Sequence, residues 1–308
     1  MSIIRVGFDE SANKDLFKNV LRKLFDNTDR EAMDEHMLVY KEYASEEEYE
    51  RDMRIAGLGL GAEVPEGEPI PLSAPYYGST KDITQAAYGN GFRITHRMNK
   101  FNKYNILKKM TKSLKVSQIE TRDVVLARVM NDPTAATYSS YVGFDTLALA
   151  THSHTILASS TTYDNYGDAG LSHAALVSAL NYFDTLIDDG GRAITAKPTR
   201  LIYHTQLKDT AHEIWRSDNK SGEFSNTKNV IPDLWDLKLS TYHRYTSASS
   251  WAVLAYEDPD YDLKCFVAME PDLDTHNAYD ETRDIVVNSL QYFSFGFGRS
   301  DMIYIGDI

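Results

Sequence analysis

The longest uninterrupted hydrophobic pattern lies between residues 100 and 130, a stretch that contains neither proline nor glycine. Leu107, Met110, Leu114, Thr121 and Val125 recur at spacings of three, four and seven. This periodicity predicts one amphipathic helix, roughly 45 Å long at ~1.5 Å per residue. Lysines dominate its predicted solvent side: Lys100, Lys103, Lys108, Lys109, Lys112 and Lys115.

Other patterns predict a mixture of helices and strands. A helix is expected from Ser45, as its N-cap, through residues 46–56, because three glutamates fill its first turn and Gly57 or Gly59 would end it. A second helix is expected over 171–191, ending at Gly190 and Gly191. Its predicted apolar side comprises Leu171, Ala175, Leu176, Leu180, Phe183 and Ile187.

Shorter segments complete an α+β pattern. "TRLIYHT" predicts a strand and "QLKDTAHEIWRS" a short helix. Further strands are predicted over 251–256, 264–270 and 283–297, several of them rich in β-branched and aromatic residues. "DITQAAYGNGFRITHRM" alternates with Tyr88, Phe92 and Ile94 among polar neighbours, and we interpret it as a strand with a bulge at Asn90-Gly91 rather than as a hairpin turn.

The segment "GLGLGAEVPEGEPIPLSAPYYG", residues 57–78, holds five glycines and four of the nine prolines of the chain. Prolines at 65, 69, 71 and 75 exclude a helix and remove backbone donors. The segment must therefore be extended, exposed on at least one edge, and poor at building a core of its own.

Composition is that of a folded protein: 308 residues, enough for about two domains, with 42% apolar and 11% aromatic residues. Twenty tyrosines suit wet surfaces and protein interfaces as well as cores. No apolar run reaches membrane-spanning length and no basic-then-apolar leader opens the chain, so neither membrane insertion nor secretion is expected. Cys265, the single cysteine, is expected to be a buried small hydrophobe.

Charge is unevenly distributed along the chain. The net charge is −13, yet residues 79–130 carry 11 Lys and Arg against 3 acids, a local charge of +8, while residues 57–78 carry three glutamates and no base. The basic segment is either a solvated helix face or a strip that docks an acidic partner surface or nucleic acid.

The candidate catalytic motifs fail on context. "GLGLGA" resembles a dinucleotide fingerprint, but a helix is expected before it and prolines follow it, the reverse of the required order. His152 and His154 could share a face of a strand and hold a metal, but further ligands are missing nearby. Asp272 and Asp274 begin a calcium-like pattern that lacks its glycine and its final glutamate. Adjacent Ser172 and His173 cannot act as nucleophile and base. The sequence therefore predicts no catalytic, cofactor or metal residue.

The order of segments is more specific than any one of them. "YGNGFRITHRM", the long helix, "LALATHSHT", "LSHAALVSALNYF", "AKPTRLIYHTQLKDTAHEIW", "NVIPDLW" and "FSFGFGRSDMIYIGD" follow one another from about residue 36 to the C-terminus. In this order the chain resembles tailed-bacteriophage major capsid proteins of the Hong Kong 97 fold, and most closely the Mu-like major head subunits. One departure is that Met302, Ile303 and Tyr304 follow Asp301, where the family commonly has tryptophan and arginine.

The resemblance implies a domain plan. Residues 1–56 would form an N-terminal arm with the acidic helix, and residues 57–98 an extended β arm, the E-loop, that reaches over a neighbouring subunit. Residues 99–170 would be a peripheral domain built on a spine helix, 171–284 an axial domain, and 285–308 a C-terminal strand that returns to the peripheral domain.

The resemblance also implies a function and partners. The protein would self-assemble into hexamers and pentamers of an icosahedral shell around double-stranded DNA, as a virion capsid assembled in the bacterial cytoplasm, with no enzymatic activity, cofactor or membrane. A separate scaffolding protein, a portal and a decoration protein are the expected partners. Expected assembly contacts are Glu66, Pro69, Pro71, Tyr76, Tyr77, Lys108, Lys109 and Lys112. Two alternatives stay open: an encapsulin-like nanocompartment shell, and a metal-dependent hydrolase that uses His152 and His154.

Overall fold

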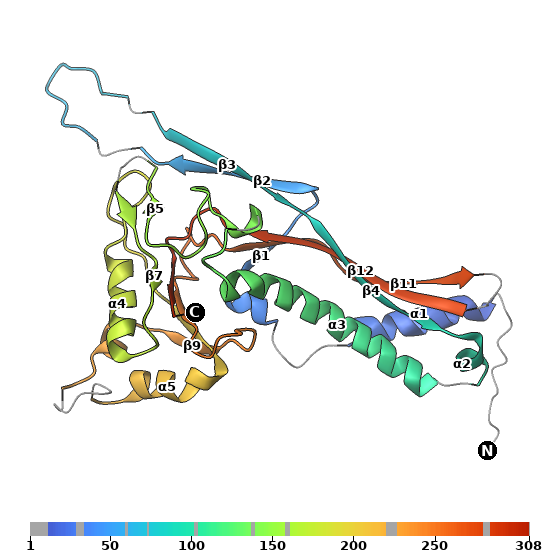
Figure 1. The fold of residues 1–308 in the computed structure, drawn as a ribbon. Helices are drawn as coiled ribbons and strands as arrows, with labels where there is room; N and C mark the ends of the chain where they lie inside the picture. Colours follow the sequence, from blue (N-terminus) through green and yellow to red (C-terminus); the bar gives the residue numbers. More distant parts are fainter. Residues whose placement is uncertain are drawn as a thin grey trace. The chain divides into compact units, whose positions relative to one another are not determined.

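A computed structural model describes residues 12–28, 34–58, 61–72, 74–101, 104–136, 139–157, 161–219, 227–279 and 284–307. The chain divides into two compact units. The first comprises Met1–Asp34, Gln85–Asp123 and Val267–Phe293, and the second Glu35–Thr84, Val124–Phe266 and Ser294–Ile308. Each unit is therefore assembled from segments that are distant in sequence (Figure 1).

The first unit is a β-sheet layer with helices. Its elements are α1 (Ala12–Asp26), β4 (Ala86–Ile94), α2 (His96–Lys100), most of α3 (Tyr104–Asn131), and the long strands β11 (Lys264–Tyr279) and β12 (Asp284–Gly296). The sheet has the order β1-β11-β12-β4, and its first strand, β1 (Lys41–Ala44), belongs to the second unit, as do the first residues of β11.

Helix α3 supplies the apolar side that closes this core. Leu107 and Leu114 are buried with residues from α1, β4, β11 and β12, namely Leu21, Phe25, Ile94, Leu273 and Val287. Two glutamines attach the helix to β12: the Gln118 side chain donates to Ser289 O at 3.1 Å, and the Gln291 side chain donates to Gln118 O at 2.9 Å. The long helix predicted from residue 100 is confirmed over Tyr104–Asn131.

The predicted strand around Asn90-Gly91 exists, but the predicted bulge is wrong. β4 pairs with β12 in unbroken antiparallel register from Ile94↔Ile285 to Ala86↔Phe293. Gly91 is needed for another reason, since a Cβ there would lie 2.8 Å from Val287 O on the partner strand. Residues 76–84 form a separate strand before Gln85, so the alternating stretch spans two strands rather than one.

The second unit is built on a five-stranded sheet with the order β7-β13-β10-β8-β9. The strands of this sheet are β7 (Tyr166–Gly167), β8 (Arg200–Tyr203), β9 (Lys238–Thr241), β10 (Trp251–Leu254) and β13 (Ile303–Gly306). Its helices are α4 (His173–Asp184), α5 (Lys208–Arg216) and the short α6 (Ile231–Leu234). The central strand β10 is buried along its whole length. Two further pairs, β2 (Tyr49–Ala56) with β3 (Tyr76–Thr84) and β5 (His154–Thr155) with β6 (Thr162–Tyr163), complete the unit.

The acidic helix predicted over 45–56 is wrong, because β2 occupies Tyr49–Ala56. Ser45 does accept a hydrogen bond from Glu47 N, as a helix cap would, but the bond closes a turn. Pairing with β3 outweighs the helix propensity of the segment.

The second predicted helix, α4, begins as expected: Ser172 is its N-cap, and the Ser172 side chain accepts a hydrogen bond from Ala175 N. The helix ends earlier than expected, at Asp184. Gly190 and Gly191 instead belong to the turn after it, where Gly191 has a φ of +78°. The strand over 200–203 and the helix over 208–216 are confirmed, while the predicted strand at 264–270 extends to Tyr279.

Gly306 is a place where the second unit tolerates no side chain. It faces Trp251 in the β10–β13 register, and a Cβ on it would overlap the buried indole ring. We expect Gly306→Ala to lower the free energy of unfolding by about 1–3 kcal/mol, because the strand or the ring must shift. Urea unfolding of the unassembled chain measures this. Gly61→Ala is the matched control, since nothing lies within 4 Å of its Cβ position, and an equal loss in both variants would contradict the packing argument.

Candidate assembly surface

Strands β2 and β3 form a two-stranded ribbon, here called the arm, together with the loop of residues 57–75 that joins them. Their antiparallel register runs from Tyr49↔Thr84 to Ala56↔Tyr76, with an irregularity between Met53 and Ile55. The loop extends away from the ribbon at the upper left of Figure 1. The ribbon therefore has an inner face, an outer face and a tip with different surroundings.

The inner face is fixed to its own unit by buried charges. Arg54 donates to both carboxylate oxygens of Asp189, with Nε to Oδ2 at 2.9 Å, and also to Thr155 O at 2.6 Å. Both side chains of the pair are less than 10% exposed. A buried arginine and carboxylate in bidentate contact satisfy each other's polar atoms, so the pair fixes the direction of the ribbon.

Lys81 provides a second attachment on the inner face. Its ammonium donates to Phe297 O at 2.8 Å and to Val142 O, and lies 4.8 Å from the centre of the Phe297 ring. Burial lowers the pKa of Lys81 to about 8, because few groups replace the water that the charge has lost. Ile83 packs beside Lys81 against Gly296.

The outer face carries apolar side chains that are about half exposed or more. Tyr49, Met53, Ile55 and Tyr77 are all exposed on it, the last by 69%. Arg51 and Asp82 form a cross-strand ion pair, with Arg51 Nε to Asp82 Oδ1 at 2.6 Å, between the apolar residues. Exposed apolar side chains grouped in this way are typical of a protein interface.

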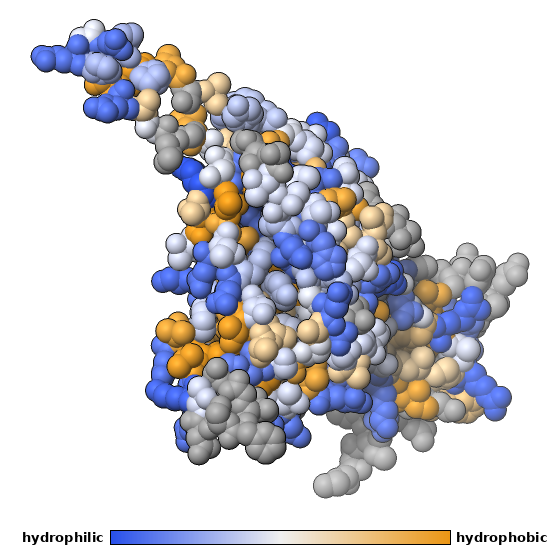
Figure 2. All heavy atoms as spheres, turned by 60° about the vertical axis from the view of Figure 1, so that its left-hand side comes forward, coloured by the Kyte–Doolittle hydropathy of each residue, from blue (hydrophilic) through white to orange (hydrophobic). Residues whose placement is uncertain are grey.

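The tip has even fewer contacts. Every residue described between 61 and 72 is exposed, including Ile70 at 76% and Leu72 at 97%. The loop is turned by a hydrogen bond from Glu68 N to Pro65 O and by Gly67, whose φ is +85°. Figure 2 shows apolar and charged side chains together on this projection, at the upper left. Its apolar groups are therefore not covered by the part of the chain that the structure describes.

The sequence-predicted contact residues fall into two groups. Glu66, Pro69 and Pro71 lie in the tip, and Tyr76 and Tyr77 begin β3 at its base. All five belong to the second unit and are exposed. Lys108, Lys109 and Lys112 lie on α3 in the first unit.

These three lysines form a basic strip on α3. All are exposed, and among the residues the structure describes none forms an ion pair or hydrogen bond with them. Lys115, also predicted for the strip, instead lies 4.9 Å from the centre of the Phe25 ring and covers the core. Lys103 falls outside the described residues, and so does the side chain of Lys100.

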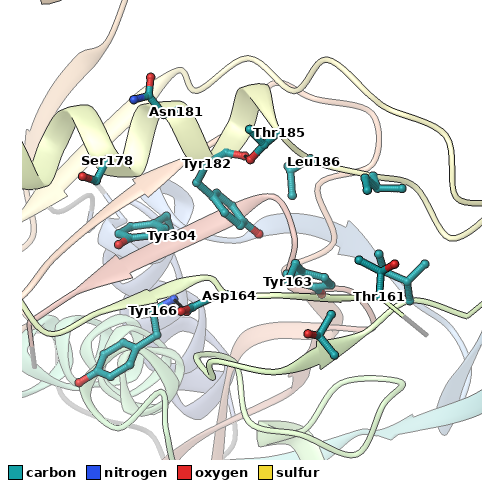
Figure 3. A pocket seen from close by; sticks show the side chains of 13 residues that line it. Thr161, Tyr163, Asp164, Tyr166, Ser178, Asn181, Tyr182, Thr185, Leu186 and Tyr304 are labelled. Carbon is teal, nitrogen blue, oxygen red and sulfur yellow. Dashed lines mark hydrogen bonds between the residues drawn. The ribbon is translucent and has the colours of Figure 1, made fainter. Parts of the chain in front are cut away.

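A cavity of about 540 Å³ lies in the second unit, between α4 and the segment that contains β6 and β7 (Figure 3). Its walls hold four tyrosines: Tyr163, Tyr166, Tyr182 and Tyr304. Leu186 and Ile187 line the end from which the chain continues to Asp189, the anchor of Arg54. The cavity therefore opens beside the base of the arm.

His154, one of the two histidines considered as metal ligands, is buried in a structural network. Its Nδ1 lies 2.7 Å from Asp145 Oδ2, and Ser300 Oγ lies 3.0 Å from Nε2 and 3.3 Å from Nδ1. A serine within 3.3 Å of both ring nitrogens lies beside the ring rather than in line with the in-plane hydrogen-bonding direction of either nitrogen, which is not the arrangement of a nucleophilic triad. Burial alone would raise the pKa of Asp145, but the hydrogen bond with His154 holds it below its usual range.

The other candidate ligands do not converge. His152 is exposed and pairs with Asp164 at 2.9 Å, which raises the pKa of the imidazole. Asp272 lies within strand β11 and pairs with Arg22. Within the described ranges, no group of three or more His, Cys, Asp or Glu could hold a metal ion. Cys265 is buried, as predicted.

None of the helices in the described part of the chain combines the length and the apolar character that crossing a bilayer requires.

By sequence, no protein-family model and no curated protein matches the chain. By structure, it is similar to a chain of Microbacterium phage Oxtober96, at 8% identity and a TM-score of 0.56 over 88% of this chain and 90% of that one. It is also similar to the virus-like particle from Pyrococcus furiosus, at 10% identity and a TM-score of 0.55 over 94% and 98%. A capsid chain of an empty GTA particle matches at 8% identity and a TM-score of 0.51, over 90% of each chain.

These similarities cover nearly the whole chain. At 8–10% sequence identity they show the fold alone. The predicted α+β class is confirmed, and the fold is one that phage capsid structures share. The Mu-like subtype stays a prediction.

Sequence reasoning missed part of the surface. Met53 and Ile55 were assigned to a helix, although the alternation of Tyr49, Arg51, Met53 and Ile55 could have indicated a strand with one apolar face. The tyrosine cavity left no local signal, since its walls come from Ile156, residues 161–164 and 166, helix α4 and its following turn, and Tyr304.

The attachment of the arm can be tested by removing one charge. Arg54→Met keeps the length of the stem but leaves Asp189 buried without its partner. We expect the free energy of unfolding to fall by about 3 kcal/mol, as when other buried pairs lose one member.

Arg51→Met is the matched control on the same strand. It breaks an exposed pair with Asp82 and should cost less than about 1 kcal/mol. Chemical unfolding of both variants measures the difference. Similar losses in the two would show that the Arg54 pair does not anchor the arm.

Proposed function

We propose that this protein is a capsid shell protein that self-assembles, in hexamers and pentamers, into an icosahedral phage head around double-stranded DNA. The observation that carries the proposal is the arm, which is fixed at its base by Arg54 and Asp189 while the apolar side chains of its tip are uncovered. The likeness to phage, virus-like-particle and capsid structures over nearly the whole chain supports it.

The physical argument is one of unsatisfied surface. Ile70 is 76% exposed and Leu72 97%, and full burial of each side chain would contribute about 1.5–3 kcal/mol. A neighbouring copy can supply that cover, and its own arm then needs the next copy. Contacts of this head-to-tail kind close into rings when the rotation between copies allows.

The family plan gives the proposed division of labour. Residues 57–98 act as the family's extended β arm, and strand β2, which begins at Tyr49, pairs with it. Residues 99–170 form the peripheral domain and residues 171–284 the axial domain. Residues 285–308 form a C-terminal strand that returns to the peripheral domain. The closest proposed type is the Mu-like major head subunit. The proposed partners are further copies of the chain, a scaffolding protein, a portal, a decoration protein and, without sequence preference, packaged DNA. The shell is assembled in the host cytoplasm and resides in the virion.

A second candidate is an encapsulin-like nanocompartment, which the likeness to a virus-like particle favours. The content of purified particles separates the two. Packaged DNA supports the phage head, whereas a cargo enzyme supports the compartment.

The contribution of the arm tip can be tested with Ile70→Ser/Leu72→Ser. These residues touch no core, so the unassembled chain should keep its unfolding midpoint, while particle yield should fall at least about tenfold because the apolar burial between copies is lost. Negative-stain microscopy and size-exclusion chromatography measure the yield. Ile106→Ser, at a less exposed isoleucine on α3 in the other unit, is the control. Unchanged yield in the double variant would overturn the role of the tip.

The basic strip is proposed to contact an acidic scaffold surface or packaged DNA. Reversing Lys108, Lys109 and Lys112 to Glu should then reduce particle formation or DNA content by about tenfold or more, since each phosphate or carboxylate contact becomes a repulsion. The triple Gln variant is the matched control for charge loss without reversal, with a smaller expected effect. Normal particles with normal DNA in the Glu variant would show that the strip is merely solvated.

A further inference from the structure

The tip of the arm has the chemistry of a proline-rich ligand. Pro69 and Pro71 flank Ile70, and Leu72 follows, so four successive uncharged residues are exposed. Proline fixes φ near −65° and favours the extended polyproline conformation, which leaves carbonyl oxygens and apolar side chains pointing outward. Such a segment loses little conformational entropy on binding.

The tyrosine cavity has the chemistry of a receptor for such a ligand. Aromatic-lined grooves are the recurring binding surface for proline-rich extended segments, because flat rings pack against pyrrolidine rings. Tyr163, Tyr182 and Tyr304 present their rings toward the same space in Figure 3, with the centres of Tyr182 and Tyr304 5.5 Å apart. Ser178 and Asn181 lie exposed on α4 at its edge and offer hydrogen bonds to carbonyl oxygens.

The cavity walls are held in place before anything binds. The Tyr182 hydroxyl donates to Asp301 O at 2.9 Å, and the Tyr163 hydroxyl lies 3.1 Å from Ser300 Oγ. His152 Nδ1 lies 2.9 Å from Asp164 Oδ2, so the one carboxylate of the lining already has a hydrogen-bond partner. Fixed walls reduce the ordering cost of binding.

The arm of the same copy does not supply the occupant. Its base, not its tip, lies beside the cavity, because Arg54 is tied to Asp189 and Gly57 lies next to Gly190. From there the loop leads away toward the upper left in Figure 1. A second copy therefore has to provide the tip.

We infer that Pro69–Leu72 of one copy bind in the tyrosine cavity of the next, an inference that rests on the proposed self-assembly of the chain. Each copy then offers one tip and one cavity at different places on its surface. The contact is heterologous, and it propagates from copy to copy instead of closing a pair.

Proximity of the two segments can be tested in assembled, full-length protein by a cysteine pair, since Cys265 is buried. Ile70→Cys/Ser178→Cys should form disulfides between copies under mild oxidation and give a ladder of multimers on a non-reducing gel. Ile70→Cys/Ser113→Cys is the matched control, because Ser113 is also an exposed serine on a helix, but in the other unit. The inference is overturned if particles form and the two pairs cross-link equally or not at all.

A blocked cavity provides a second test that does not disturb the tyrosines. Ser178→Trp places an indole at the cavity edge, where it blocks entry of the tip of the next copy. Particle yield should fall about tenfold or more, because the apolar contact between copies is lost. The unfolding midpoint of the unassembled chain should not change. Ser113→Trp should assemble normally. Normal assembly of Ser178→Trp would also overturn the inference, while leaving the proposed function intact. Failure of the unaltered chain to form any particle, with or without scaffold, would instead contradict the proposed function.

Discussion

The structure depends on the buried contact between Arg54 and Asp189, because it determines where the arm leaves its unit. Two charges taken out of water are costly unless their partners are well placed, and here the guanidinium also reaches Thr155 O while Leu157 N donates to the same carboxylate. Lys81 adds a third buried charge on the same face of the ribbon. A ribbon held this firmly at its base can present an uncovered tip in one direction, whereas a loosely attached one would collapse onto the nearest apolar surface.

Several groups that could do chemistry are instead used to build the interior. His154, Asp145 and Ser300 bond with one another beneath the surface, and Cys265 lies among packed side chains. The polar residues that remain accessible are arranged as surfaces: a lysine strip on α3, a mixed apolar and acidic tip, and a cavity walled by tyrosines. Surfaces of this kind are what the proposed shell function requires.

What the sequence predicts well are features that depend on neighbours along the chain. The periodicity of Leu107 and Leu114 specifies the face of α3, and the prolines of the tip exclude regular structure wherever the arm lies. Residues 46–56 were predicted wrongly because their helix-forming composition competes with a pairing partner, β3, some twenty residues further on. The role of Gly91 is likewise set across the sheet, by Val287. The tyrosine cavity could not be predicted, since Tyr163, Tyr182 and Tyr304 meet only after the five-stranded sheet has formed.

The uncovered tip has a consequence for the lifetime of the chain in a cell. An extended loop without neighbours is the kind of segment that proteases cut first, and Tyr76 and Tyr77 stand at its end as exposed aromatic cleavage points. Once a partner covers the loop, those peptide bonds are sheltered. Degradation would then remove surplus or orphaned copies and spare incorporated ones, so the segment proposed to join the molecules would also select which copies survive.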